Sequence, residues 1–411
     1  MSVCGFGPTV RTFFPLMALA MALFGAGCAA STPPPVAIVA PANEADFEPP
    51  LKIDWIAELT PREDEPVFMP VEFSAPGLDD NRAYVGTARG QFFAVDRSDG
   101  RVVWRYDAWG PVESTPAITA DLVIFGDSEG TVYALNKKTG RARWTYSAAT
   151  EILGGLATDG DRLFFGTSDN RVYCLDLATG QWKWTYQREL PVTFTIRGIS
   201  TPVVRGDRVY MGFSDGYAVA LNRQDGKEVW KNLLRIDDAL VDVDATPLVV
   251  GDRLYIAAYD GSLYCLGAES GDVLWKMDNG GSISPPAVRG NYLFVAGTDG
   301  RVYGLSRADG SVLWQADIRD LDKDHSLAGA PRRRLKIPTA PLLVGTTLLT
   351  GSSDGYLYAL DARDGSVLWR YYPGYGLSGD FAYADHRVYF LGNGGRLFAL
   401  RPSLFPPDPL Y

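Results

Sequence analysis

Side chains that commonly carry catalysis are scarce in this chain of 411 residues. Its two histidines, His325 and His386, are too few for histidine-based metal clusters or nucleophile relays. Aspartate recurs in short "SDG" and "TDG" segments, and its carboxylate is a possible calcium ligand. A carboxylate in such a segment more often forms a turn, so we expect turns there. The sequence predicts no catalytic residue, no metal site and no bound cofactor.

Residue types suited to protein recognition gather in two stretches, "QRELPVTFTIRGISTP" (residues 187–202) and "LLRIDDALVDVDATP" (residues 233–247). The residues of interest are Phe194, Ile196, Arg197, Asp242 and Asp244. Apolar side chains bordered by charges of both signs are typical of protein-binding surfaces. In the alternative interpretation Arg197 only pairs with the two aspartates and holds the stretches together.

The N-terminal segment has the pattern of an export signal. Arg11 precedes an apolar run over residues 13–26, which is short for a membrane span but suits a signal-peptide core. Small residues come directly before Cys28, as in the lipobox of bacterial lipoproteins, although Gly25 stands where that motif usually has leucine. We therefore predict a signal peptide over residues 1–27 and acylation of Cys28. An ordinary cleaved signal with an incidental cysteine is the alternative.

Residues 28–50 are predicted to be the lipidated cysteine and a flexible tether, which "TPPP" and "EPP" keep extended. Ala29 follows the cysteine, where lipoproteins retained in the inner membrane have aspartate. We therefore expect a palmitate-bearing lipoprotein in the cell outer membrane, facing the periplasm.

Composition narrows the class of partner and of fold. Lys and Arg number 39 against 49 Asp and Glu, a net charge of −10. This balance argues against nucleic acid or an anionic membrane surface as the main partner. Apolar residues make up 46% of the chain, and 44 glycines accompany little helical periodicity. Short strands joined by tight turns are expected.

After residue 80 the sequence repeats itself. The units "YVGTARGQFFAVDRSDGRVVW" and "IFGDSEGTVYALNKKTGRARW" align without gaps, and five further complete copies follow. The closing tryptophans are Trp104, Trp144, Trp184, Trp230, Trp275, Trp314 and Trp369. An eighth copy, "YFLGNGGRLFALRPS", stops before its tryptophan. Repeats of this length with several short strands each indicate a β-propeller.

The stretch "LKIDWIAELT" (residues 51–60) supplies the strand that the eighth copy lacks. It would pair beside "GRLFAL" and place Trp55 in the empty tryptophan position, which removes an exposed sheet edge. We predict an all-β, eight-bladed propeller of four-stranded antiparallel blades over residues 51–403, closed by this N-terminal strand, with a tail at 404–411. A seven-bladed ring plus an unrelated strand is the alternative.

One small residue recurs in the third strand of each predicted blade. The eight are Ala94, Ala134, Cys174, Ala220, Cys265, Gly304, Ala359 and Ala399. We expect the indole to pack over this position, where no larger side chain fits. Cys174 and Cys265 fall in blades separated by another blade, so they are predicted to be buried free thiols.

The link from each outer strand to the next inner strand should lie on the same propeller face as the "SDG" turns. Residues 187–202 and 233–247 are then the long links of adjacent blades. We expect them side by side, so that Phe194, Ile196, Arg197, Asp242 and Asp244 form one surface, called here the two-link patch.

Two families share these features. The unit "ALDxxTGxxxW" resembles the tryptophan motif of quinoprotein dehydrogenases, eight-bladed enzymes that bind pyrroloquinoline quinone with calcium. Those enzymes are longer and usually carry an adjacent Cys–Cys pair, which this sequence lacks. The lipobox, the eight units and "FTIRG.STP" followed by "DVDATP" instead resemble the BamB family of the outer-membrane β-barrel assembly (BAM) machinery.

The second resemblance implies a non-enzymatic scaffold whose two-link patch docks on a POTRA domain of BamA. It also implies that blade edges pair with strands of unfolded outer-membrane proteins. Phe194 stands where the family often has leucine, which keeps the apolar character. A quinone-dependent dehydrogenase and a ligand-binding envelope propeller remain alternatives. The insertion within residues 315–337, with its basic run "RRRLK", is either a solvated loop or a second contact surface.

Overall fold

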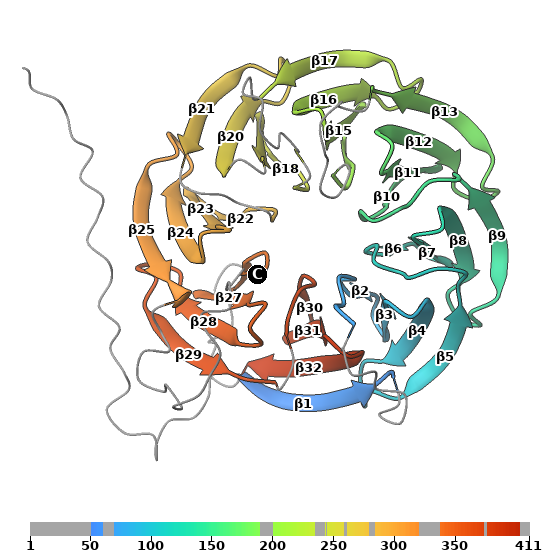
Figure 1. Cartoon of the computed structure of the whole chain (residues 1–411), viewed down its shortest axis with the longest axis horizontal. Coiled ribbons are helices and arrows are strands. Elements are labelled where there is room, and N and C mark those ends of the chain that lie inside the picture. Colours follow the sequence, from blue (N-terminus) through green and yellow to red (C-terminus); the bar gives the residue numbers. More distant parts are fainter. Residues whose placement is uncertain are drawn as a thin grey trace, which may run out of the picture. The chain divides into compact units, whose positions relative to one another are not determined.

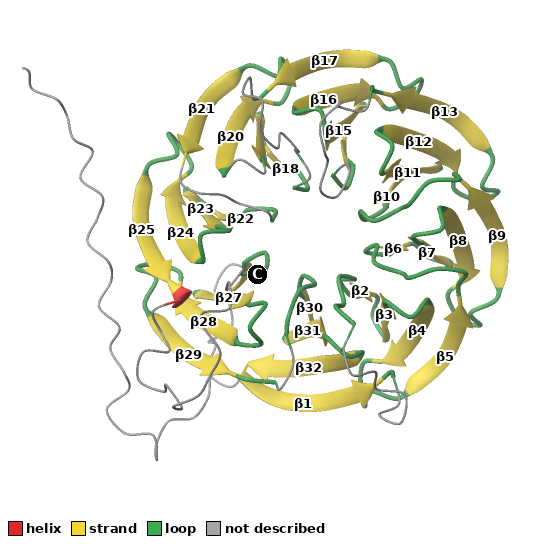
Figure 2. Cartoon of the chain, viewed as in Figure 1, coloured by secondary structure: helices red, strands yellow, loops and turns green. Residues whose placement is uncertain are grey.

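The computed structural model of the chain describes residues 51–60, 70–189, 200–234, 243, 245–258, 261–278, 284–319, 338–373 and 376–402. Within these ranges the regular elements are β-strands, apart from a short 3₁₀ turn at residues 318–319 (Figure 2). No helix in the described ranges is long and apolar enough to cross a membrane.

Eight four-stranded antiparallel sheets stand around a central axis, which confirms the predicted eight-bladed propeller (Figure 1). Blades one to seven each use four consecutive strands, from β2–β5 to β26–β29. Blade eight has the strand order β1-β32-β31-β30, so its outer strand comes from the N-terminal side of the chain. The predicted closure is therefore confirmed, and the seven-bladed alternative is wrong.

Each blade starts with a short strand beside the axis and continues with a strand whose side chains are almost all buried. The inner strands are β2 (Gly77–Leu78), β6 (Ala117–Ile118), β10 (Ala157–Asp159), β14 (Val203–Arg205), β18 (Leu248–Val250), β22 (Ala287–Arg289), β26 (Leu342–Val344) and β30 (Ala382–Ala384). The second strands are β3 (Arg82–Gly86), β7 (Leu122–Gly126), β11 (Arg162–Thr167), β15 (Arg208–Gly212), β19 (Arg253–Ala257), β23 (Tyr292–Ala296), β27 (Thr347–Gly351) and β31 (Arg387–Gly392).

The third strand is also buried, whereas the outer strand exposes much of its length. The third strands are β4 (Gln91–Asp96), β8 (Thr131–Asn136), β12 (Arg171–Asp176), β16 (Tyr217–Asn222), β20 (Ser262–Gly267), β24 (Arg301–Ser306), β28 (Leu357–Asp361) and β32 (Arg396–Pro402). The outer strands are β5 (Val102–Asp107), β9 (Ala142–Ser147), β13 (Trp182–Gln187), β17 (Glu228–Leu233), β21 (Val273–Asp278), β25 (Val312–Asp317), β29 (Val367–Tyr371) and β1 (Leu51–Glu58).

The register of β1 matches that of the other outer strands. Trp55 pairs with Ala399, and Trp104 pairs with Ala94 in the same way. The pairing of β1 shifts by one residue between Ile53 and Trp55, and β5 has the same irregularity next to Trp104. Strand β1 therefore reproduces the outer strand of a complete repeat, although it lies at the opposite end of the sequence.

Each indole packs against its own blade and the next one. A Cβ atom added to Gly304 would lie 2.3 Å from the indole of Trp314, which confirms the predicted packing over the small position. A Cβ added to Gly100, in the last turn of blade one, would lie 2.7 Å from Cε3 of Trp55, and the φ of Gly100 is 78°. Only glycine allows both this close approach of the ring and a positive φ. Equivalent contacts join Trp104 to Gly140, Trp144 to Gly180, Trp184 to Gly226, Trp230 to Gly271, Trp275 to Gly310 and Trp314 to Gly365.

Hydrogen bonds fix the direction of these indoles. Trp55 Nε1 donates to the carbonyl oxygen of Arg97 in blade one at 3.0 Å. The indoles that donate in the same way at 3.0 to 3.1 Å are Trp104, Trp144, Trp184, Trp230 and Trp314. A buried indole N–H needs an acceptor, and for these six indoles the turn of the following blade both contacts the ring and accepts that hydrogen bond. Trp275 Nε1 is the exception, since it has no partner among the described residues.

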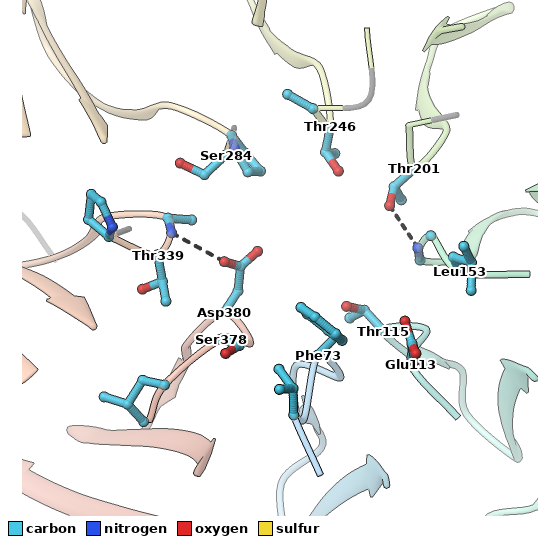
Figure 3. Close-up of a pocket in the computed structure, with 18 of the residues that line it drawn as sticks. Phe73, Glu113, Thr115, Leu153, Thr201, Thr246, Ser284, Thr339, Ser378 and Asp380 are labelled. Atoms are coloured by element: carbon cyan, nitrogen blue, oxygen red, sulfur yellow. Dashed lines mark hydrogen bonds between the residues drawn. The ribbon is translucent and has the colours of Figure 1, made fainter. Parts of the chain in front are cut away.

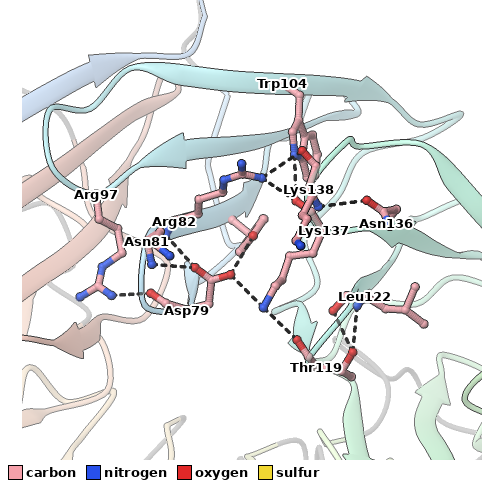
Figure 4. Close-up of polar contacts among 11 residues, drawn as sticks. Asp79, Asn81, Arg82, Arg97, Trp104, Thr119, Leu122, Asn136, Lys137 and Lys138 are labelled. Carbon is pink, nitrogen blue, oxygen red and sulfur yellow. Dashed lines mark hydrogen bonds and ion pairs between the residues drawn. The ribbon is translucent and has the colours of Figure 1, made fainter.

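Charged side chains reinforce the junction of blades one and two (Figure 4). Lys137 Nζ lies 3.1 Å from a carboxylate oxygen of Asp79, and Arg82 Nη1 donates to the Lys137 carbonyl oxygen at 2.7 Å. At the closing junction Arg97 donates to Tyr389 Oη at 3.1 Å and to Asp385 at 2.8 Å. The junction made by the chain's two ends thus has the same kind of polar contact as a junction between consecutive repeats.

The hydrophobic core is divided among the eight junctions. The described residues form eight buried clusters, and each cluster draws on two adjacent blades. The cluster at the closing junction unites Trp55 and Tyr389 with Val85 and Phe93 of blade one. Cys174 and Cys265 are buried and free, as predicted. Because no blade buries its faces alone, the ring must close for its last two faces to leave water.

The closing contact generates a stability prediction. Replacing Trp55 by Ala should lower the free energy of unfolding by about 3 to 5 kcal/mol, because a buried indole and its hydrogen bond are lost. Ile56→Ala is the matched control on the same strand, since Ile56 is 44% exposed. Denaturation of both variants measures the difference in the free energy of unfolding.

Deletion of residues 51–58 should produce aggregation, because it leaves the edge of β32 without a strand partner. A wild-type melting temperature for that deletion would contradict the closure.

Candidate functional site

The residues predicted to bind a partner or a lipid lie outside the described part of the chain. They are Cys28, Phe194, Ile196, Arg197, Asp242 and Asp244. The structure does describe both ends of each long link, so it shows how the two links are attached to the propeller.

The first link leaves β13 beside a partly buried ion pair. Arg188 Nε lies 2.6 Å from Asp215 Oδ2, and its guanidinium carbon stands 4.0 Å from the ring centre of Tyr217. The backbone N–H of Arg188 also donates to the carbonyl oxygen of Asn170. Burial raises the pKa of the Asp215 carboxyl above its ordinary value, while the Arg188 hydrogen bond and charge oppose that shift. This end of the link is held firmly by blade four.

The second link is held by the same part of blade four. The backbone N–H of Leu234 donates to the Gly216 carbonyl oxygen at 3.0 Å, and that of Val243 donates to Phe213 at 3.1 Å. Val243 is fully buried, and its Cγ1 would lie 2.4 Å from a Cβ added to Gly212. Both links are thus fastened to the segment around the turn between β15 and β16. Their attachment points are neighbours, while the two-link patch itself stays a prediction.

Several links carry, near their last residue, a hydroxyl that is hydrogen-bonded to the blade that the link enters. The hydroxyl of Ser114 accepts a hydrogen bond from Gly126 N–H at 2.9 Å and donates to the Gly126 carbonyl oxygen at 2.8 Å. Equivalent hydroxyl acceptors are Ser200 for Gly212 and Thr339 for Gly351. A pinned backbone fixes the direction of the next residue, which faces the propeller axis.

These next residues line a cavity of about 560 Å³ at the axis (Figure 3). Six of them are Thr115, Gly155, Thr201, Thr246, Pro285 and Ala340. All six are uncharged and small or of medium size, and the Gly155 N–H donates to Thr201 Oγ1 at 2.7 Å. The cavity wall is therefore built by the same position of successive links.

Blade eight breaks this pattern with a carboxylate. Asp380 occupies the position equivalent to Thr115, and its Oδ1 accepts a hydrogen bond from the Ala340 N–H at 3.3 Å. Burial raises the pKa of the Asp380 carboxyl, and the single hydrogen bond only partly opposes that shift. Glu113 also lines the cavity, and no described lining residue is Lys, Arg or His. The described lining therefore contributes two acidic side chains and no basic one.

A second exception stands beside the cavity, at Glu72. The equivalent positions of other links carry buried apolar residues, Val112 and Val243 among them. Glu72 is 1% exposed, and its Oε2 accepts a hydrogen bond from the Ala88 N–H at 2.7 Å. Burial raises the pKa of the Glu72 carboxyl to about 7, although that hydrogen bond opposes the shift.

The described residues do not fit a quinone cofactor with its metal. Among them no group of three or more His, Cys, Asp or Glu side chains is placed to hold a metal ion. Pyrroloquinoline quinone carries three carboxylates, and Glu113 and Asp380 would repel them where no described lining residue offers a positive charge. Of the two histidines, His386 lies in a turn with φ of 58°, and His325 lies outside the described ranges.

Solved structures with the same architecture belong to proteins of different function, and at their low identities the likeness shows the fold. BamB from Moraxella catarrhalis is 22% identical, with a TM-score of 0.70, over 81% of this chain and 98% of that chain. Quinohemoprotein alcohol dehydrogenase ADHIIG from Pseudomonas putida HK5 is 14% identical, with a TM-score of 0.66, over 88% of this chain and 78% of that chain. The computationally designed Ika8 protein is 16% identical, with a TM-score of 0.65, over 84% of this chain and 98% of that chain.

The fold and the repeats therefore define an eight-bladed propeller of the quinoprotein-repeat class. Within that class, the family described as outer membrane protein assembly factor BamB matches residues 54–158, 126–316 and 317–403. The chain belongs to the BamB family, as its sequence motifs predicted. No curated protein sequence matches the chain significantly.

Asp380 and Glu72 were not predicted, because neither lies in a blade repeat or in one of the two longest links. An alignment of all the links would have shown both residues. Asp380 stands where Thr115, Thr201 and Thr246 occur, and Glu72 stands where Val112 occurs. A charged residue at a position that other repeats fill with neutral residues signals a local role.

Glu72 generates a pH prediction. Its pKa is about 7 in the folded chain against 4.5 for the ordinary carboxyl, so the folded chain holds the proton more tightly. This tighter proton binding stabilises the folded state below pH 4.5, and the stabilisation is lost as pH rises towards 7. At 1.4 kcal/mol per pKa unit, the free energy of unfolding falls by about 3 kcal/mol over this range. The melting temperature of the wild type should therefore fall relative to Glu72→Gln across this range. Glu151→Gln, at an exposed residue, is the control and should follow the wild type.

Proposed function

We propose that this chain is a non-enzymatic scaffold of the BAM machinery, tethered by lipid to the periplasmic leaflet of the outer membrane. The observation that carries the proposal is the match to the BamB family across residues 54–403. The cavity supports the non-enzymatic part, because its described lining does not suit the anionic cofactor of the quinoprotein enzymes.

The scaffold binds a POTRA domain of BamA through the two-link patch. The attachment geometry supports this assignment, because Arg188 and Val243 tie the bases of both links to blade four. Neighbouring bases allow residues from two links to contact one partner surface. Firm bases also reduce the conformational entropy that the links lose on binding.

The outer strands offer a second mode of contact. Each forms the last strand in the order of its sheet, so one edge has no strand partner among the described residues. Extended segments of unfolded outer-membrane proteins can add to such an edge through backbone hydrogen bonds. Exposed apolar side chains such as Ile53 and Leu274 lie on these strands and favour apolar segments.

The lipid anchor is tested by Cys28→Ala. The variant should lose acylation, and the protein should leave the membrane fraction, because the cysteine thiol is the acceptor of the lipid. Its melting temperature should match the wild type, since Cys28 precedes the first propeller strand, which begins at Leu51. Metabolic labelling with palmitate and membrane flotation measure the two outcomes. Persistent labelling of the variant would show that the anchor lies elsewhere.

The two-link patch is tested by Arg197→Glu and Phe194→Ala. The charge reversal places a carboxylate beside Asp242 and Asp244, and it should weaken binding to the BamA POTRA domains by roughly 2 to 5 kcal/mol. Phe194→Ala should weaken binding through loss of an apolar anchor. Titration calorimetry measures the affinities. Arg141→Glu is the control, because Arg141 is exposed in the turn before β9 on the opposite face.

Thermal melting of the same variants distinguishes a role of Arg197 in binding BamA from a role in holding the two links together. If Arg197 only holds the links together, its replacement should lower the melting temperature while the folded protein still binds BamA. Unchanged affinity in both variants would remove the patch from the interface.

A further inference from the structure

The cavity at the propeller axis has the size and the rigidity of a small-molecule site. Its lining extends from Val71, in the link to blade one, to Asn393, in the last turn of blade eight. A volume of about 560 Å³ falls within the range of sites that enclose small ligands. The hydrogen bonds of Ser114, Ser200 and Thr339 to strand ends hold the wall in place. A ligand would meet a preformed surface.

Asp380 is the strongest sign of what this surface binds. Its side chain extends towards the middle of the cavity (Figure 3). Within the described ranges its carboxyl accepts one hydrogen bond, from the Ala340 N–H at the long distance of 3.3 Å. The Asp380 carboxyl is only partly buried, so a positive group that enters the cavity can reach it and pair with it. The threonines at the equivalent positions of blades two, four and five carry no charge.

The rest of the lining suits a cation with an organic body. Glu113 adds a second acidic side chain and no described lining residue is Lys, Arg or His, so this lining favours a cation over an anion. Hydroxyls of Thr115, Thr246 and Ser378 can accept hydrogen bonds from an ammonium group. Phe73 gives the same wall an apolar surface against which methylene groups can pack.

We propose that the axial cavity binds a small organic cation with a primary ammonium group, paired with Asp380 and hydrogen-bonded by the surrounding hydroxyls. A bare metal ion fits the site less well. Calcium takes six to eight oxygen ligands in a close shell, and no described trio of acidic, His or Cys side chains is placed to hold a metal. An ammonium group needs only one carboxylate and a few acceptors. The proposal does not depend on the role in barrel assembly.

The test uses the purified full chain and three four-carbon probes that differ only in charge. Butane-1,4-diamine is the cationic probe, butane-1,4-diol is the neutral one and succinate is the anionic one. Titration calorimetry or saturation-transfer NMR at low ionic strength should show binding of the diamine alone. Probe concentrations up to roughly 10 mM cover dissociation constants near 1 mM.

Two substitutions locate the site. Asp380→Asn removes the charge, and Asp380→Thr restores the residue found at the equivalent position of three other blades, so both should fold. Each should weaken binding of the diamine by roughly tenfold or more, because the charged hydrogen bond is lost. Asp121→Asn makes the same change at an exposed turn residue outside the cavity and should leave the affinity unchanged.

Several results would overturn the proposal. The first is that the diamine fails to bind up to the highest concentration. The second is that the diol or succinate binds as tightly as the diamine, and the third is that the Asp380 variants bind the diamine as tightly as the wild type does. Calcium that binds tighter than the diamine and competes with it would assign the cavity to a metal instead. Melting curves of the variants confirm that a loss of binding comes from folded protein.

Discussion

The fold depends on one recurrent contact, the indole of one blade seated on a glycine of the next. Trp55 on Gly100 shows why the contact is so restrictive, since a Cβ on that glycine would collide with the ring and the backbone has a positive φ. Each blade needs its successor to bury its own tryptophan, so the ring is stable only when it is complete. The last contact in the circle is made by a strand from the other end of the propeller sequence. Trp369 has no equivalent described glycine, because no turn joins β32 to β1.

A ring held together by its repeats leaves the links free to differ. The blade sequence must supply a tryptophan, a small residue and a turn glycine at fixed places, whereas a link must only span from an outer strand to the next inner one. Hydroxyl pins such as Ser200 to Gly212 position the end of the link without constraining its middle. Features that serve recognition can therefore gather in the links, and both the two-link patch and Asp380 lie there.

Local pattern was enough to predict the strands, their order and the closure. The missing tryptophan of the eighth copy predicts Trp55 in that position, and the structure places it there, paired with Ala399. The docking of each indole on the next blade was not predicted, because a contact between repeats leaves no spacing signal within one repeat. The cavity was not predicted for a similar reason. Its wall comes from eight distant links that only the fold brings around one axis, although an alignment of the links shows Asp380 to be unusual. The residues of the two-link patch rest on family motifs, since their types alone fit an internal pin equally well.

The proposed two-link patch and the cavity share links, and hydrogen bonds hold the described link residues next to the cavity wall. On the first link, Ser200 lies between the patch residues and Thr201 of the cavity wall, and its backbone and hydroxyl are both bonded to Gly212. On the second link, Val243 is bonded to Phe213 just ahead of Thr246, another wall residue. Coupling between two sites requires an element with two arrangements that both ligands bias, and the hydrogen bonds of Ser200 and Val243 favour one arrangement of the backbone there. A cation should therefore bind in the cavity whether or not a partner protein is bound at the two links.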